Sequence, residues 1–117
     1  MIRLKQQLEE SVREEIRGGL GKARLVEYLS SGDMIGEVTF LSTVKLEPGS
    51  TIGDHPHPDA EEFYLILEGK GVGVLDGETF EVEPGDGYLC RAGHAHSLRN
   101  TGEEPLTFLA LLTREKS

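Results

Sequence analysis

Turn residues cut most of this chain into short apolar runs, and that punctuation constrains its fold more than any other feature. Fifteen glycines and five prolines occur among 117 residues. Asp76-Gly77 separates runs 72–75 and 79–82, an arrangement typical of a tight β-hairpin. Short runs bounded by turn signals indicate strands rather than helices. The predicted strands cover residues 24–29, 37–46, 62–67, 72–75, 79–82, 88–91, 94–100 and 106–112. We therefore expect a single all-β domain, built as a sandwich or barrel.

The N-terminal segment has a different pattern. Its apolar residues recur at every fourth position, with charged residues between them: Leu4, Leu8, Val12 and Ile16. This period predicts an amphipathic helix over residues 1–17, which Gly18-Gly19 would end. We accordingly divide the chain into a helical or irregular arm, residues 1–22, and a barrel domain, residues 23–117. The arm is expected to pack on its own domain or on a second subunit.

Charge and hydropathy argue against several classes of partner. The net charge is −9 at pH 7, so the surface would repel nucleic acid and anionic membranes. No apolar run approaches the roughly 20 residues that a transmembrane helix needs. Cys90 is the only cysteine, so no intramolecular disulfide can form, and its apolar neighbours predict a buried thiol. These features predict a cytoplasmic protein with neither a nucleic-acid nor a membrane partner.

Two glycine-bounded clusters carry residues with metal-binding chemistry. His55 and His57 stand two positions apart, so in an extended segment their side chains project from the same face. Glu62 heads an apolar predicted strand, where a carboxylate needs a partner that a cation can supply. His96 lies near the start of another predicted strand. Imidazoles and a carboxylate together are a ligand set for a divalent transition metal.

The two clusters resemble the two sequence motifs of the cupin superfamily, and the likeness extends over residues 37–112. The first motif is matched by Gly49, His55, His57, Glu62 and Gly69, and the second by Gly85, Gly93, His96 and Asn100. Arg91 stands where the family usually has proline, which should loosen one turn without removing a ligand. The resemblance implies a double-stranded β-helix, or jelly-roll, barrel that is often dimeric. It also implies one metal ion inside the barrel, bound by His55, His57, Glu62 and His96.

Other residues of the clusters fit such a site less well. Glu61 would face the other side of its strand, and only Glu62 preserves the motif spacing. His94 lies outside the motif register, in a turn, and is expected at the rim. The ligand set accepts Mn, Fe, Co, Ni, Cu or Zn, so the sequence leaves the metal open. No further cofactor site is predicted, because no helix follows the glycines at 69–73 to make a phosphate loop.

Two functions stay open at this point. The resemblance implies a small metalloenzyme of the dioxygenase, decarboxylase, isomerase or lyase type that acts on a small oxygen-rich metabolite. The alternative is a non-catalytic cupin that binds or senses a small ligand and has a structural metal. For the enzyme, Tyr64 and His94 are the candidate catalytic residues, beside Glu61 and a metal-bound water. The expected cavity lining is Phe40 or Leu41, Tyr64, Ile66, Tyr88 or Cys90, and Leu98, with Arg91 near the mouth.

An outward apolar stripe predicts a homodimer. Phe63, Leu65 and Leu67 alternate with Glu62, Tyr64 and Ile66 and therefore face away from the barrel interior. Such a stripe needs cover from another sheet or from a second copy.

Overall fold

The computed structural model describes residues 1–115, which form ten strands and two short 3-10 turns. The strands are β1 Glu10–Glu14, β2 Lys22–Ser30, β3 Val38–Leu46, β4 Thr51–Pro56, β5 Ala60–Glu68, β6 Gly71–Leu75, β7 Glu78–Val82, β8 Gly87–Cys90, β9 Ala95–Asn100 and β10 Leu106–Arg114. The turns are η1 Lys5–Gln7 and η2 Ile16–Gly18. The predicted all-β class is confirmed. Two strands, β1 and β4, were not among those predicted.

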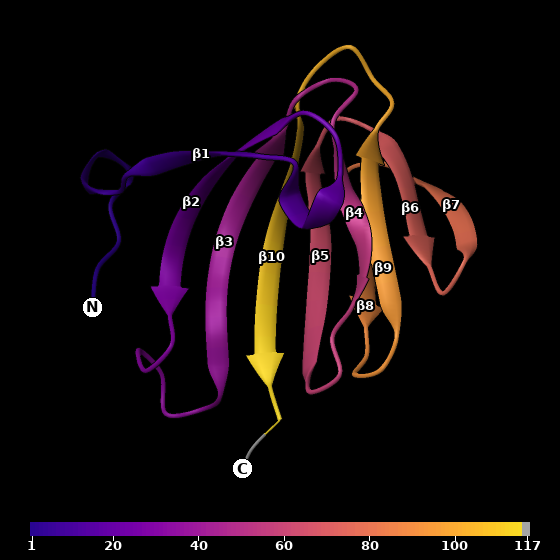
Figure 1. The fold of residues 1–117 in the computed structure, drawn as a ribbon. Coiled ribbons are helices and arrows are strands. Elements are labelled where there is room, and N and C mark those ends of the chain that lie inside the picture. The colour runs from indigo at the N-terminus through magenta and orange to yellow at the C-terminus, as the bar shows by residue number, and fades with distance from the viewer. Residues whose placement is uncertain (116–117) are drawn as a thin grey trace.

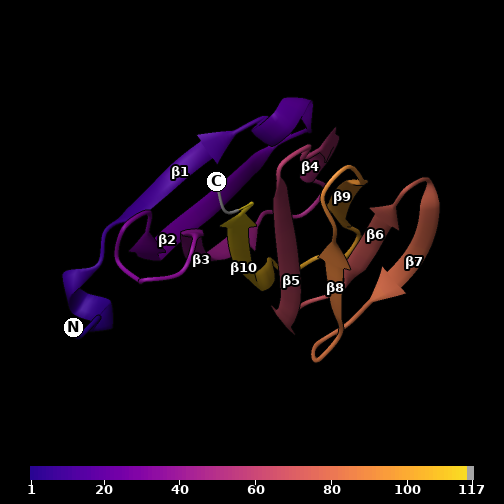
Figure 2. The same ribbon diagram turned by 90° about the horizontal axis from the view of Figure 1, so that it is seen from below.

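The strands form two antiparallel sheets that enclose the core. One sheet has six strands in the order β1-β2-β3-β10-β5-β8, and the other has four in the order β4-β9-β6-β7. Figures 1 and 2 show the two sheets curving toward each other, with β4 and β9 beside β5 and β8. No helix among the described residues has the length and apolar character needed to cross a membrane.

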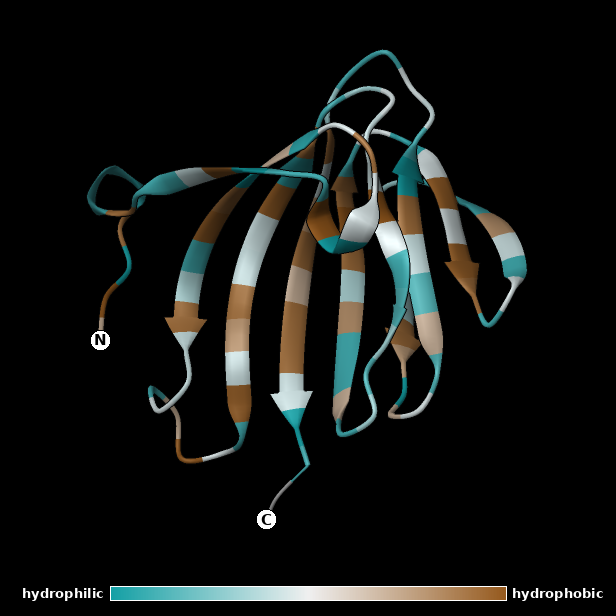
Figure 3. Cartoon of the chain, viewed as in Figure 1, coloured by the Kyte–Doolittle hydropathy of each residue, from teal (hydrophilic) through white to brown (hydrophobic). Residues whose placement is uncertain are grey.

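Alternation along the strands fills the space between the sheets. In β5, Glu62, Tyr64 and Ile66 are buried, whereas the intervening Phe63 and Leu65 face outward and are half-buried. The same alternation is visible on several strands in Figure 3, where brown and paler or teal bands follow one another. The largest fully buried side chains lie on strands of both sheets: Phe108, Leu46, Ile66, Leu98, Leu106, His96, Asn100 and Cys90. One core therefore spans both sheets, and polar residues are built into it.

The hairpin between β6 and β7 forms at the predicted place. Asp76 and Gly77 both have positive φ angles, 49° and 81°. This is the left-handed pair that a two-residue hairpin turn needs, and the Asp-Gly sequence supplies it at low cost. The turn sets the register in which Leu75 pairs with Glu78 and Gly71 with Val82.

The N-terminal arm was expected to be either helical or irregular, and it is irregular. The prediction of a helix over residues 1–17 is wrong. Residues 10–14 form β1, which pairs with β2 at the edge of the six-stranded sheet. Leu4 and Val12 are 44% and 58% exposed, so the period-four pattern does not mark a buried face. A short isolated helix is marginal in water, whereas the free edge of β2 offers a full row of backbone hydrogen bonds. Strand pairing therefore prevails over the local pattern.

After β1 the arm crosses to the four-stranded sheet and is fastened to β4. In Figure 1 the arm runs in front of β2, β3 and β10, and in Figure 2 its turn lies beside β4. Leu20 and Thr51 exchange two hydrogen bonds, of 2.7 Å and 2.8 Å. Gly19 and Gly53 let the two backbones meet, because a Cβ on Gly53 would lie 2.0 Å from the carbonyl oxygen of Arg17. The arm thus joins the free edges of the two sheets.

Candidate metal centre

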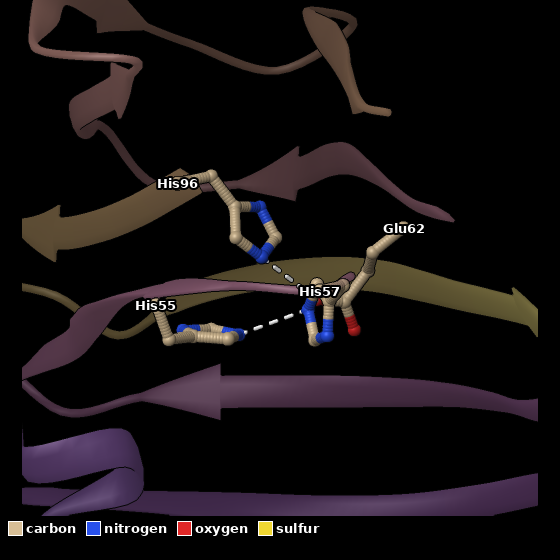
Figure 4. A group of neighbouring side chains, drawn as sticks. All are labelled: His55, His57, Glu62 and His96. Atoms are coloured by element: carbon tan, nitrogen blue, oxygen red, sulfur yellow. Dashed lines mark hydrogen bonds and ion pairs between the residues drawn. The ribbon is translucent and has the colours of Figure 1, made fainter. Parts of the chain in front are cut away.

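Four side chains from the two sequence clusters meet inside the barrel. They are His55, His57, Glu62 and His96, and all four are buried. Their nitrogen and oxygen ligand atoms all lie within 4.8 Å of one another. Figure 4 shows the imidazoles and the carboxylate converging on one place. The structure therefore brings together the four residues to which the sequence pointed.

The group spans both sheets, so the fold itself fixes its geometry. His55 lies in β4 and pairs directly with His96 of β9. Glu62 comes from β5 of the other sheet, and His57 follows the end of β4. Pro56 and Pro58 flank His57 and restrict the backbone there. Three of the ligands thus come from strands whose register is held by backbone pairing.

The distances within the group are those of atoms that share one centre. The Nε2 atoms of His55 and His57 are 3.0 Å apart, and His57 Nε2 lies 3.3 Å from Glu62 Oε1. His96 Nε2 lies 2.9 Å from the same oxygen but lacks hydrogen-bond geometry toward it. Among the described residues, both ring nitrogens of His96 are buried without a hydrogen-bond partner. Burying polar atoms in this way is costly, and a cation between the four groups would give His96 Nε2 a partner.

The donor set fits a divalent transition metal. Three neutral imidazoles and one carboxylate would reduce the charge of a divalent ion to +1. Four protein ligands would also leave an ion with a higher coordination number free to accept oxygen atoms of a small molecule. His55 and His57 would supply nitrogen from one segment, and Glu62 and His96 would complete the set from two other strands.

Hydrogen bonding and burial prepare His55 for this role. Its Nδ1 atom lies 2.7 Å from the carbonyl oxygen of Gly53, which can only accept, so Nδ1 carries the proton and Nε2 is left for the centre. Burial lowers the pKa of His55 below its ordinary 6.5; the Gly53 bond opposes this, and the charges of His96, His57 and Arg17 add to it. The ring is therefore neutral at pH 7.

Glu62 is held in its charged form. Burial alone raises the pKa of this carboxyl, but its contact with His96 and its interactions with the nearby imidazoles of His96, His57 and His55 outweigh burial. Its pKa therefore lies below the ordinary 4.5. An ionised carboxylate surrounded by imidazole nitrogens is what a metal ion would require at this position.

Tyr64, one of the two candidate catalytic residues, lies against the group. Its ring stacks on His96 with the centroids 4.8 Å apart, and it is only 3% exposed. Burial, reinforced by the Glu62 charge, raises the pKa of Tyr64 well above 10. The hydroxyl therefore stays protonated and can act as a hydrogen-bond donor at neutral pH.

His94, the other candidate, lies away from the group in the turn before β9. Its ring is exposed and hydrogen-bonds Asp76 in the β6–β7 turn. Cys90 is fully buried, and burial raises its pKa to about 11, so the thiol is neutral and inert as a nucleophile. Neither His94 nor Cys90 lines the pocket near the metal ligands, whereas Tyr64 does.

A pocket of about 170 Å³ opens onto three of the four candidate metal ligands, His55, His57 and Glu62. The arm contributes Arg13, Ile16 and Arg17; the sheets contribute Leu25, Glu27, Phe40, Ser42, Val44, Ile52, His55, His57, Glu62, Tyr64, Phe108, Ala110 and Leu112. Phe40 and Tyr64 were predicted in this lining. Four other residues predicted in the lining are buried but do not line the pocket: Ile66, Tyr88, Cys90 and Leu98. The Tyr88 hydroxyl instead donates a hydrogen bond to the carbonyl of Ser97.

No local sequence pattern predicted the two pocket arginines of the arm. Arg13 is exposed but lines the pocket, because β1 pairs with β2 in a register that sets Arg13 opposite buried Ala23. Arg17 lines the pocket because η2 turns back onto β4. Both facts depend on how the arm docks. Arg91, the arginine predicted near the mouth, is exposed and does not line the pocket.

Comparisons with known proteins agree with this architecture. Residues 42–112 match the cupin domain family. The chain is 36% identical over 97 residues to the oxalate-binding protein of Thermotoga maritima, an alignment that covers 83% of this chain and 80% of the relative. It is also 32% identical over 104 residues to the oxalate decarboxylase OxdC of Bacillus subtilis, covering 84% of this chain but only 26% of that protein.

A solved structure gives the same picture. The crystal structure of a predicted oxalate decarboxylase from Thermotoga maritima superposes with a TM-score of 0.93 at 32% identity, over 97% of this chain and 99% of that one. The likeness confirms the jelly-roll barrel inferred from the sequence motifs. With the family match spanning more than half of its residues, this chain belongs to the cupin domain family.

Proposed function

We propose that this protein holds a divalent transition metal at His55, His57, Glu62 and His96 and uses it to bind a small carboxylic acid of the oxalate kind. The observation that carries this proposal is the buried convergence of four ligand atoms within 4.8 Å, beside a small pocket that His55, His57 and Glu62 line. A bound metal would supply Lewis acidity toward carboxylate oxygens. The names of the two relatives from Thermotoga maritima and Bacillus subtilis support oxalate as the first ligand to try.

The chain's own residues divide the remaining work. His55 and His96 would present neutral imidazoles, the first oriented by its bond to Gly53 and the second by its stack on Tyr64. Apolar side chains such as Phe40 and Phe108 would exclude water from the ligand. Such a dry pocket strengthens every charge interaction inside it.

The experiment that tests the proposal is elemental analysis followed by calorimetry. Untagged protein purified without chelators should contain one transition metal near one equivalent, and it should bind oxalate more tightly than neutral oxamide. Protein stripped with a chelator should lose oxalate binding and regain it when the metal is restored. Folded protein that takes up no metal from Mn, Fe, Co, Ni, Cu or Zn would contradict the proposal.

Enzymatic turnover is the second candidate function, and Tyr64 is the observation that favours it. A buried phenol that stays protonated beside the ligand group can donate a hydrogen bond to a bound carboxylate. Metal-loaded protein would then convert oxalate and one proton into carbon dioxide and formate, and Tyr64→Phe would lower the rate while the metal content stays constant. Binding without turnover in the wild type would leave the non-catalytic function.

We also propose that two copies pair through the outer face of the six-stranded sheet, as a cytoplasmic homodimer in keeping with the single free thiol. Two rows of outward residues cross this face by direct strand pairing: Leu29, Leu41, Leu111, Phe63 and Leu89, and beside them Val26, Thr43, Leu109 and Leu65. Contiguous apolar area of this kind marks an interface.

Sedimentation at micromolar concentration tests the dimer. Leu111→Glu places a charge in the middle of one row and should give monomers, whereas Thr79→Glu, on exposed β7 of the other sheet, should leave the dimer intact. A wild-type monomer would remove the proposal.

A further inference from the structure

The arm brings two arginines to the pocket from outside the barrel. Arg13 lies in β1 opposite Ala23, Arg17 lies in the η2 turn next to β4, and both residues are exposed to solvent. Both line the same pocket as His55, His57 and Glu62. Ile16, between them, packs against the hydrophobic core and anchors this part of the arm. The barrel thus supplies the pocket floor, and the arm supplies part of its rim.

Neither guanidinium is used in an ion pair among residues 1–115. In contrast, Arg24, which lies on the neighbouring strand β2, pairs with Glu10 and Glu47 at 3.4 Å and 3.2 Å. The chain has 21 acidic and 12 basic residues, so partners are abundant. Arg13 and Arg17 therefore keep their charges and donors available to a bound molecule.

The backbone holds Arg17 in place at a conformational cost. Arg17 has φ = 54° and ψ = 34°, and Glu15 has φ = 49° and ψ = 46°. Both lie in the left-handed region, which residues with a side chain rarely occupy. The turn is closed by hydrogen bonds from Glu15 N to Gly21 O and from Gly18 N to Glu15 O, of 2.9 Å and 3.0 Å. Strain that the surroundings enforce is typical of functional positions.

The charges around the pocket suit a small dianion. Arg13 and Arg17 contribute two positive charges, and Glu27 on β2, the acidic residue of the rim, offsets one. The site of the proposed function adds a divalent ion and the Glu62 carboxylate, so the sum over the whole pocket is +2. A volume of about 170 Å³ is below the roughly 300–1,000 Å³ of pockets for drug-sized ligands, which restricts the molecule to a few carbon atoms.

We propose that Arg13 and Arg17 are specificity-determining residues that bind a carboxylate of the ligand and so select small dicarboxylates over neutral analogues. The inference rests on the proposed function, because the metal would hold the other oxygen atoms of the same molecule. Guanidinium groups are suited to this task since their planar fork matches a carboxylate. Their positive charge also attracts the anion toward the mouth of an otherwise acidic protein.

The test compares Arg13→Gln and Arg17→Gln with Arg24→Gln, which removes the same charge from the outer face of β2. Metal content is measured first, and binding of oxalate, malonate and oxamide is then followed by titration calorimetry. Each pocket variant should weaken dicarboxylate binding by about tenfold to hundredfold, the usual effect of losing a charge-assisted contact. Arg24→Gln should bind like the wild type, and Arg17→Lys should recover part of the loss.

Glu27→Gln should change the dicarboxylate affinity in the opposite direction. Removing the one acidic charge of the rim should tighten dicarboxylate binding by severalfold and leave oxamide binding unchanged. This gain tests whether charge at the pocket rim controls the affinity for the dianion. It also keeps the proposal testable if an arginine variant folds poorly.

The possible failures can be told apart. Arginine variants that keep their metal and bind oxalate within about twofold of the wild type would overturn the inference while the metal site stands. Wild-type protein that takes up no metal would overturn the proposed function. The arginines would then be tested by malonate titration of the metal-free protein, where equal binding by variants and wild type would overturn the inference as well.

Discussion

The floor and the rim of the pocket differ in how their structure is determined. The floor is built from β4, β5 and β9, whose pairing with neighbouring strands fixes His55, Glu62 and His96 in both sheets. The rim is built partly from the arm, which has local periodicity for a helix but forms a strand and a left-handed turn. The floor follows from residues and turns within its own segments. The position of the arm depends on where the free edges of β2 and β4 lie. The residues that it brings to the pocket therefore cannot be predicted from local sequence patterns.

The largest expected effect comes from breaking the floor. His57→Ala removes a buried imidazole that lies 3.0 Å from His55 and 3.3 Å from Glu62. Loss of an outer-shell partner already lowers metal affinity by roughly 10–100-fold, so loss of a direct ligand should lower it by about 100-fold or more. Metal content after dialysis, measured by plasma mass spectrometry, should fall to near zero.

His94→Ala is the matched control for this variant. It also removes one imidazole, but an exposed one that contacts Asp76 outside the pocket. We expect full metal content and wild-type circular dichroism. A His57→Ala protein that keeps its metal, or a His94→Ala protein that loses it, would show that the ligand set has been wrongly assigned.

A smaller effect is expected from separating the rim from the floor. In Gly53→Ala the new Cβ would meet the carbonyl oxygen of Arg17 at 2.0 Å, and because both sides are backbone the arm must shift. Overpacking of this kind costs about 1–3 kcal/mol in free energy of unfolding. Dicarboxylate binding should weaken together with stability, because Arg17 moves with the turn.

Gly36→Ala serves as the control, since no atom lies within 4 Å of its Cβ position. Urea unfolding should show a lower midpoint for Gly53→Ala and an unchanged one for Gly36→Ala. Equal midpoints would mean that the arm does not press on β4 in solution, and the coupling between rim and floor would be lost.

The same contrast explains how far the sequence could predict the molecule. The Asp76-Gly77 turn and the alternation in β5 are local, so the hairpin and the inward position of Glu62 were both predicted. The clusters at His55 and His96 were recognisable because their spacing with glycines is itself the signature of the barrel. In physical terms, these features depend only on residues that lie close to one another in the sequence.

Features that depend on distant segments were missed. Residues 51–56 form β4 by pairing with β9, and residues 10–14 form β1 by pairing with β2. Neither run has strong strand propensity on its own, because β4 contains glycine and proline and β1 is mostly charged. Tertiary pairing decides these two elements, and with them the positions of Arg13 and Arg17.

The smallest effect is expected from acidification, which changes the stability of the protein through titratable residues of the floor and not of the rim. Because the pKa of His55 is lowered below 6.5 in the folded state, the unfolded chain binds more protons just below that pH. Stability of the metal-free protein should therefore be complete above pH 6.5 and decline as the pH falls through this window, by about 1.4 kcal/mol for each unit by which the two pKa values differ. Glu62, whose pKa is also lowered, adds a loss of the same sign below pH 4.5.

Thermal unfolding of chelator-treated protein between pH 7.5 and 5.5 measures the effect of His55. His55→Gln should flatten the profile. A wild-type protein that becomes more stable on acidification would mean that His55 gains a proton on folding, which its burial and its bond to Gly53 in the neutral form oppose.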